Sequence, residues 1–349
     1  MKSAILKNGK IVITEKEIPT LKNAEGAIIK VKACGLCGSD IVKINHATPE
    51  NEDKISLGHE IVGEIVDINV KIKGMGAKEP FKKGDIIAMG HHYPCFKCKY
   101  CTHGNYSMCK TFKNSNIHPG GFSEYIYANS NHLKNTVFKK PENLTEEEFS
   151  FLEPLSCCIR AVKRSGLVFD NKELNKTYNA LVLGLGSIGI LMAQAIKAFG
   201  ANTFGFDINE KRQEFIKNYG INFNENIKYD LIFMTSGANK AIDSAMKLID
   251  KGGKIIVFSS IPDDFKGYFN NEIYYKELDV LGSYSPSPDD LKMSYEFLKL
   301  GFVNVKNISA KYSLENLENA INGTKQGKIL KGYIELWKWK LSCFMPQKI

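Results

Sequence analysis

The sequence predicts an α/β protein with two domains, a β-rich barrel followed by a doubly wound parallel sheet. At 349 residues, the chain is longer than one hydrophobic core usually supports. About the first 150 residues hold short β-rich runs separated by Gly, Asn and Pro, which is typical of a β-barrel. From residue 154 onward, strand-like runs alternate with helical patterns. That alternation predicts a parallel sheet with helices on its faces.

The predicted elements follow the chain in order. In the first domain the β-rich runs cover residues 26–33, 61–70 and 85–89. In the second domain the strand-like runs cover residues 180–184, 202–207, 229–234, 254–259 and 278–282. A helix at 314–323 and a strand at 331–336 then return the chain to the first domain. The predicted domains are 1–153 and 154–300, with 301–349 completing the first. The tail 337–349 is expected to pack on the surface or at a subunit contact rather than to anchor in a membrane.

Composition and charge narrow the classes of function. Lys and Arg number 47 against 38 Asp and Glu, a net charge of +9, but only three of the cations are arginines. Nucleic-acid-binding proteins depend on bidentate contacts from arginine guanidinium groups, so the positive charge argues only weakly for that class of protein. The longest uncharged stretch, 177–196, is interrupted by glycines and reads as strand, turn and buried helix. We therefore expect neither a nucleic-acid nor a membrane partner.

Cysteine usage and the amino terminus predict the compartment. The first 20 residues contain an apolar run of only four residues, which is too short for the core of a signal peptide. We expect a cytoplasmic protein. Its nine cysteines are then expected to hold metal or pack in the core rather than to form disulfides.

Four of the cysteines follow the spacing C-x2-C-x2-C-x7-C: Cys95, Cys98, Cys101 and Cys109. Four thiolates this close can converge on one tetrahedral ion, and they leave no open position for a substrate. The spacing predicts a structural zinc ion, with an iron–sulfur cluster as the alternative. A zinc-ribbon nucleic-acid module would instead need two paired knuckles well separated in sequence. The nearby histidines are expected to be ordinary surface or loop residues: His91, His92 and His103.

A second metal pattern lies upstream of this loop. Cys37 in CGLCGSD and His59 in LGHE each stand at the edge of a β run, beside glycines. A thiolate and an imidazole form a zinc pair, and a third protein ligand would leave the open position that catalysis needs. The candidates for this third ligand are Glu60 and Glu153. Cys34, in the preceding strand, is expected in the core.

A glycine-rich turn predicts a dinucleotide site. The motif GLGSIG follows the apolar strand 181–183 and precedes the helix 190–199, so amides at the helix start can approach a pyrophosphate. Its members are Gly184, Gly186, Ser187, Ile188 and Gly189. Asp207 ends the next strand, where a carboxylate binds an adenosine ribose and repels a 2′-phosphate. We expect NAD(H) rather than NADP(H), with Lys211 and Arg212 as the residues that could still accept a phosphate.

Taken in order, these motifs resemble the zinc-dependent medium-chain alcohol dehydrogenases over about residues 1–336. The resemblance is carried by CGLCGSD, LGHEIVG, FKKGDIIAMG, the four-cysteine loop, GGFSEY, EPLSC and GLGSIG. Glu-Pro-Leu at 153–155 is most similar to the sorbitol (L-iditol) dehydrogenase branch and related polyol, sugar and threonine enzymes, since simple alcohol dehydrogenases carry a zinc cysteine there. The resemblance implies a GroES-like catalytic domain, a Rossmann domain and NAD(P)-linked alcohol oxidation. It also implies a homodimer or homotetramer, with Val280 to Ser285 as a candidate contact.

The resemblance further implies roles around the upstream metal pattern. Cys37 and His59 match the catalytic zinc ligands. Glu60 and Glu153 match two glutamates that relatives use either as ligand or through water. Asp40 matches the carboxylate that orients the zinc-bound histidine.

Other positions match proton transfer and cofactor contacts. Ser39 matches the hydroxyl that receives the substrate proton. Val42 departs from the pattern, because many relatives carry a histidine there that passes the proton to solvent, and His46 is a candidate substitute. The remaining matches lie beside the nicotinamide, at its amide and on the pyrophosphate: Cys157, then Gly282 with Ser283, and Lys331.

The sequence therefore predicts a dehydrogenase with two zinc ions per chain that moves hydride between a secondary alcohol of a polyol or sugar-like substrate and NAD+. A carboxylate in place of one cysteine makes the metal site harder and favours substrates with neighbouring hydroxyls. The lysine excess makes a phosphorylated substrate worth testing. The alternatives are a dehydrogenase of threonine or simple alcohols, a zinc-free reductase of the same superfamily and, in another class, a zinc-binding nucleic-acid module.

Overall fold

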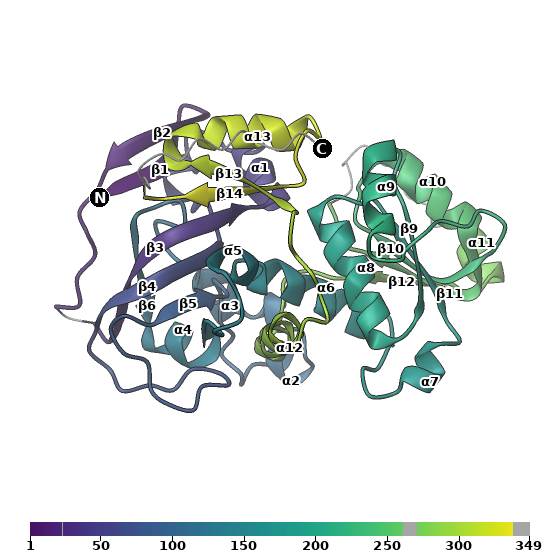
Figure 1. Ribbon diagram of the computed structural model, residues 1–349, viewed down its shortest axis with the longest axis horizontal. Helices are drawn as coiled ribbons and strands as arrows, with labels where there is room; N and C mark the ends of the chain where they lie inside the picture. Colours follow the sequence, from purple (N-terminus) through teal and green to yellow (C-terminus); the bar gives the residue numbers. More distant parts are fainter. Residues whose placement is uncertain (23, 261–270, 338–349) are drawn as a thin grey trace. The chain divides into compact units, whose positions relative to one another are not determined.

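Two compact units make up the chain in the computed structural model, which describes residues 1–22, 24–260 and 271–337. Among the described residues, the first unit comprises Met1–Glu153, Ser287–Lys299 and residues 305–337, and the second comprises Pro154–Pro286 with Leu300–Asn304 (Figure 1). The first boundary falls after Glu153, as in the sequence-based division. The predicted tail at 337–349 lies outside the described residues except for Trp337.

The first unit is built on a seven-stranded sheet in the order β13-β14-β3-β4-β5-β7, with β6 paired to β3. A separate antiparallel hairpin, β1 (Lys2–Lys7) and β2 (Lys10–Glu15), precedes it. The sheet strands are β3 (Gly26–Leu36), β4 (Glu60–Ile68), β5 (Ile86–Met89), β6 (Tyr125–Asn129), β7 (Val137–Lys139), β13 (Ser309–Ser313) and β14 (Lys331–Glu335). The helices are α1 (Gly38–Asn45), α2 (Lys99–Thr102), α3 (Lys110–Asn114), α4 (Ser130–Asn135), α5 (Glu146–Phe149), α12 (Pro288–Lys299) and α13 (Leu317–Lys325). The β runs, the helix and the closing strand predicted for this part of the chain are confirmed.

Helix α12 belongs to the first unit, although the sequence-based division placed it in the second domain. Leu291 lies directly over Gly90, and the ring of Tyr295 stacks on that of Phe138 at 5.3 Å between centroids. The apolar face of this helix predicts that it is buried. The same apolar face does not indicate which of the two hydrophobic cores covers the helix. For that reason the sequence-based division assigned α12 to the second domain.

The pairing of β3 with β4 positions the upstream metal residues. Gly35 lies opposite Glu60 in this antiparallel pair, so the end of β3 is beside the start of β4. Cys37 follows β3 directly and is the N-cap of α1, and His59 immediately precedes β4. Strands β3 and β4 lie side by side (Figure 1), so Cys37 and His59, which are 22 positions apart in the sequence, lie at one end of this strand pair.

The second unit is built on a five-stranded sheet in the order β12-β11-β10-β8-β9, in which every neighbouring pair is parallel. Its strands are β8 (Asn179–Leu183), β9 (Asn202–Phe206), β10 (Tyr229–Met234), β11 (Ile249–Val257) and β12 (Asp279–Gly282). Its helices are α6 (Leu152–Arg164), which begins at the boundary, α7 (Lys172–Asn175), α8 (Ser187–Phe199), α9 (Glu210–Lys217), α10 (Asn239–Leu248) and α11 (Asn271–Tyr275). Helices α8 and α10 pack against the strands (Figure 1). The five predicted strands are confirmed, with the largest shift at β11.

Within the described ranges, no helix has both the length and the apolar character needed to cross a membrane.

Candidate zinc centres and nucleotide site

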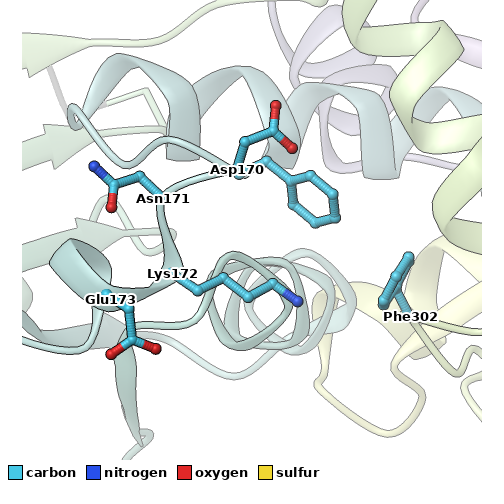
Figure 2. A pocket seen from close by; sticks show the side chains of 6 residues that line it. Asp170, Asn171, Lys172, Glu173 and Phe302 are labelled. Carbon is cyan, nitrogen blue, oxygen red and sulfur yellow. The ribbon is translucent and has the colours of Figure 1, made fainter.

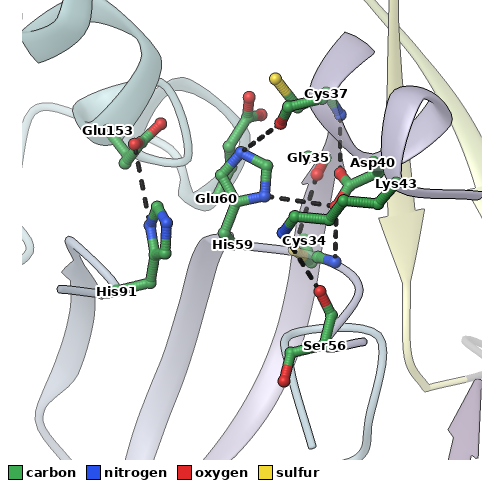
Figure 3. A network of polar contacts seen from close by, with 12 residues as sticks. Cys34, Gly35, Cys37, Asp40, Lys43, Ser56, His59, Glu60, His91 and Glu153 are labelled. Atoms are coloured by element: carbon green, nitrogen blue, oxygen red, sulfur yellow. Dashed lines mark hydrogen bonds and ion pairs between the residues drawn. The ribbon is translucent and has the colours of Figure 1, made fainter. Parts of the chain in front are cut away.

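Cys37, His59 and Glu60 form a group, here named the catalytic cluster, that can hold one metal ion (Figure 3). His59 and Glu60 are buried, and Cys37 is half-buried. One ligand atom from each residue lies within 4.8 Å of the others. A thiolate, an imidazole and a carboxylate are donors that zinc accepts in open catalytic sites, so these residues fit a catalytic zinc ion. Of the two candidates for the third ligand, the structure groups Glu60, and not Glu153, with the other two.

Asp40 holds the His59 ring in a fixed orientation. Its Oδ1 lies 3.3 Å from His59 Nδ1 and accepts the Gly58 N–H at 3.0 Å. Its Oδ2 accepts the Cys37 N–H at 3.1 Å. Burial raises the pKa of Asp40, but His59, with smaller contributions from Lys43 and the Gly58 N–H, lowers it to about 2. The carboxylate therefore stays charged and engages Nδ1, which leaves Nε2 of His59 for a metal.

Lys331 neutralises Glu60 inside the fold. Its ammonium contacts both carboxylate oxygens, and both side chains are buried. Burial lowers the pKa of Lys331, but the charges of Glu60 and Cys37 raise it above its usual value. Gly35 makes room for the pair, since a Cβ there would lie 2.0 Å from Glu60 Oε2. The resemblance implied a pyrophosphate contact for Lys331, and that role stays a prediction, because the partner found for this ammonium is Glu60.

Glu153 faces a histidine that the sequence patterns did not single out. Its Oε1 lies 3.7 Å from His91 Nδ1, and the two side chains are 6% and 11% exposed (Figure 3). The His91 ring lies 4.8 Å from that of His59 and 4.2 Å from that of His92. Burial is the main cause that lowers the pKa of both His91 and His92, that of His92 to about 3. Both residues lie in the loop after β5, as expected, but they are half-buried and packed ring against ring. The available signal was two adjacent histidines shortly after a strand.

The four-cysteine loop brings its thiols together, again within 4.8 Å of one another: Cys95, Cys98, Cys101 and Cys109. Cys109 Sγ accepts the Cys95 N–H at 3.4 Å. Burial raises the pKa of the Cys109 thiol, but backbone N–H donors from Cys95 and Phe112 help to lower it to about 6. Four convergent thiols, of which Cys109 has backbone donors that favour its thiolate, fit a closed tetrahedral zinc ion. Cys34, expected in the core, is fully buried in β3.

The glycine turn lies between β8 and α8, as predicted. Gly184 has φ +97°, a left-handed conformation that glycine adopts without strain. A Cβ on Gly189 would lie 1.8 Å from the Gly184 carbonyl oxygen, so this close approach of helix and strand requires glycine. Gly186 is the N-cap of α8, and Ser187 and Ile188 open the helix. The unpaired amides at this helix start are suited to a pyrophosphate.

Asp207 lies against the same turn. Its Oδ2 accepts the Leu185 N–H at 2.6 Å, and its Oδ1 accepts the Asn209 N–H at 2.8 Å. Arg212 Nη1 lies 3.6 Å from Asp207 Oδ2. The carboxylate at the end of β9 is thus fixed beside the turn.

Comparison with known protein families identifies two family models that match the chain. The model described as alcohol dehydrogenase GroES-like domain matches residues 23–142, and the model described as zinc-binding dehydrogenase matches residues 187–299. Together they cover about two thirds of the chain. The chain belongs to the zinc-dependent medium-chain dehydrogenases. The GroES-like and Rossmann folds and the class of alcohol or polyol dehydrogenase are thereby confirmed.

This dehydrogenase is similar to named relatives over nearly its whole length. It is 28% identical to sorbitol dehydrogenase of Bacillus subtilis (strain 168) over 94% of both chains, and 26% identical to D-xylulose reductase A of Aspergillus oryzae over 93% of both. The structure of galactitol-1-phosphate dehydrogenase from Escherichia coli matches with a TM-score of 0.78 at 25% identity, covering 96% of this chain and 100% of that one. A putative zinc-binding dehydrogenase from Sinorhizobium meliloti 1021, bound to NADP, shares the fold with a TM-score of 0.79 at 21% identity, covering 96% and 99%.

The predicted proton path of the dehydrogenase begins beside His59. Ser39 Oγ lies 3.4 Å from His59 Nε2. Val42 is exposed on α1. His46 Nδ1 donates to the Val42 carbonyl at 3.0 Å and so caps its own helix. A role for His46 in proton exit stays a prediction.

The remaining predicted cofactor positions of the dehydrogenase lie in its second unit. Cys157 is half-buried on α6, and Gly282 ends β12. Ser283 is buried, and its hydroxyl has no hydrogen-bond partner among the described residues. Their assignment to the nicotinamide stays a prediction.

A separate hollow of about 500 Å³ in the second unit is lined by Phe169, Asp170, Asn171, Lys172, Glu173 and Phe302 (Figure 2). The Lys172 ammonium lies 5.4 Å from the Phe169 ring centroid and 5.8 Å from that of Phe302. None of the predicted site residues lines this hollow, so the dehydrogenase chemistry is not assigned to it.

Proposed function

We propose that this dehydrogenase oxidises a secondary alcohol of a polyol or sugar-like substrate with NAD+, removing a hydride and a proton to give a ketone and NADH. The observation that carries the proposal is the carboxylate in the catalytic cluster. A carboxylate ligand makes a zinc site harder than a second cysteine would, and a harder site accepts oxygen donors more readily. That property suits a substrate with neighbouring hydroxyl groups. The relatives named sorbitol dehydrogenase and D-xylulose reductase support the same class.

The geometry indicates the role that each of the chain's own residues would have. Zinc held by the catalytic cluster supplies a Lewis acid that makes the substrate hydroxyl more acidic. Asp40 keeps the His59 ring oriented through Nδ1. Ser39 Oγ, 3.4 Å from His59 Nε2, is placed to receive the proton that leaves the substrate. Lys331 places a positive charge against the buried Glu60 carboxylate.

NAD+ is the proposed cofactor because of Asp207. A carboxylate at this position accepts hydrogen bonds from the ribose hydroxyls and repels a 2′-phosphate. Arg212, 3.6 Å away, offsets part of that charge. NADP+ is therefore the second cofactor to test.

Three finer features belong to the proposal. A homodimer or homotetramer is supported by β12, an edge strand of its sheet on which Val280 is exposed. A phosphorylated polyol is supported by the lysine excess and by the likeness to galactitol-1-phosphate dehydrogenase. A cytoplasmic location is supported by cysteines that are grouped for metal rather than paired as disulfides.

Turnover of protein with a counted zinc content tests the proposal. We expect about two zinc ions per chain and NADH formation with one class among polyols, polyol phosphates, threonine and simple alcohols. NADP+ is run in parallel with NAD+. Activity confined to simple alcohols or threonine would contradict the polyol assignment, and a protein that binds neither zinc nor NADH would overturn the proposal altogether.

A further inference from the structure

We propose that His91 is a positioning residue, which holds the Glu153 carboxylate toward the catalytic cluster and so sets how tightly the cluster keeps its zinc. The inference rests on the proposed zinc-dependent function. His91 Nδ1 is buried and has no hydrogen-bond partner within the described part of the chain. The Glu153 oxygen at 3.7 Å is an acceptor that a small rotation of either side chain brings within hydrogen-bond distance.

Glu153 lies close to the catalytic cluster without being one of its three members. Its partner His91 has a ring that lies 4.8 Å, between centroids, from the ring of His59, a member of the cluster. The Glu153 side chain is only 6% exposed. A buried carboxylate requires partners that fix it, and beside a metal site its orientation decides whether it approaches the ion.

The His91 ring has little freedom to turn away. It is packed between the rings of His59 and His92, and His92 in turn lies 4.7 Å from the ring of Phe112. His132 Nε2 approaches the His91 carbonyl at 3.3 Å, which fixes the backbone of the same residue. This row of rings joins the catalytic cluster to the four-cysteine loop, because Phe112 packs on Cys101 and Cys109. The donor is therefore held in place from both sides.

A neutral donor is the chemically suitable partner at this position. An imidazole N–H orients a carboxylate without adding positive charge next to a divalent ion, whereas a lysine would compete with the metal. Outer hydrogen-bond partners of this kind orient metal-site ligands, and their loss typically weakens metal affinity about 10- to 100-fold.

The test compares two replacements of the same ring. His91→Phe keeps an aromatic ring in the row but removes the N–H, and His91→Asn keeps an N–H close to the position of Nδ1. The measurement is zinc content and the affinity for the more weakly held zinc, by competition with a chelator. We expect His91→Phe to lose about tenfold or more in affinity at one site, with His91→Asn within about threefold of the unchanged protein. His92→Phe is the matched control, since His92 is the next ring in the row and has no Glu153 contact among the described interactions.

Glu153→Gln gives a second route that leaves the row of rings intact, should His91→Phe fail to fold. Glu153→Gln alone is expected to weaken zinc binding. In the double variant, His91→Phe should then cause almost no further loss of zinc affinity. Unchanged zinc affinity in His91→Phe, or equal losses in His91→Asn and His91→Phe, would overturn the positioning role. Additive effects in the double variant would overturn it as well. An unaltered protein with zinc only in the four-cysteine loop would instead overturn the proposed function, so the two failures are distinguishable.

Discussion

The four-cysteine loop and the catalytic cluster both collect zinc donors, but they are assembled in different ways. The loop takes all four thiols from one short segment, Cys95 to Cys109. The catalytic cluster takes its ligands from the end of β3 and the start of β4, with Lys331 of β14 on its carboxylate. A short segment closes around an ion at little entropic cost, whereas distant segments meet only when the sheet has formed. The formation of the cysteine site therefore depends on the spacing of its residues in the sequence, and the formation of the catalytic cluster depends on the folded sheet.

The two sites also differ in what a metal ion can do there. Four thiolates fill a tetrahedral shell, so an ion in the loop stabilises structure. Three ligands leave one position open, so an ion in the catalytic cluster can bind substrate. Removing a ligand from each site should therefore change different properties of the protein.

His59→Ala is the largest expected effect, because it removes a zinc ligand from the open site. We expect activity to fall on the order of 10,000-fold, since the Lewis acid is worth several kcal/mol. Zinc analysis should show one ion fewer per chain. The control is His103→Ala, which removes an exposed imidazole from the four-cysteine loop. Full activity in His59→Ala would show that catalysis does not use this cluster.

Cys109→Ser should do the reverse and act first on stability. Loss of the loop ion is expected to lower the free energy of unfolding by at least about 4 kcal/mol, because structural zinc binding contributes directly to folding. Thermal unfolding and zinc content check this. Cys158→Ala, in the core of the second unit, should keep both ions. A Cys109→Ser protein of ordinary stability that still binds two zinc ions would remove the structural role of the loop.

The contrast also explains how much of the protein could be predicted. The cysteine spacing, the glycine turn with Asp207 and the alternation of strands and helices are local patterns, and the structure contains each of them. Cys37 and His59 were found because each lies in a short glycine-bearing motif. Patterns among residues that are close in the sequence can be recognised without a structure, and these sites are built from such residues.

What the sequence did not predict depends on contacts between distant segments. Nothing local indicates that Lys331 contacts Glu60, or that Glu60 rather than Glu153 is grouped with Cys37 and His59. The contact between His91 and Glu153 was not predicted either, because Glu153 is far along the chain. Helix α12 was placed with the wrong domain for the same reason. Strand order and packing decide such contacts, and they are properties of the whole fold.

Lys331→Met sharpens the comparison inside the catalytic cluster. The substitution leaves Glu60 buried without its counter-charge, which typically costs about 3 kcal/mol or more. Bound zinc supplies positive charge to the same carboxylate, so the loss should be larger after the weakly held zinc is removed than before. Thermal midpoints of the two states measure this difference. Lys139→Met is the control, because Lys139 pairs with Asp85 from a half-exposed position. Equal losses with and without zinc would show that Lys331 and the metal do not share Glu60.

Asp207→Asn extends the comparison to the second unit and has the smallest expected effect. Like the cysteine loop, the nucleotide site is formed by residues that are close in the sequence. Its selectivity between NAD+ and NADP+ depends on the Asp207 carboxylate at the end of β9, which the Leu185 N–H holds in place. Asparagine keeps the shape and removes the charge, so the preference for NAD+ over NADP+ should fall about tenfold, equivalent to one charge-assisted hydrogen bond. Asp230→Asn is the matched control, because Asp230 also accepts a strand N–H, from Asn179, at the opposite end of the strands. An unchanged cofactor ratio in Asp207→Asn would mean that Arg212, and not the carboxylate, sets the preference.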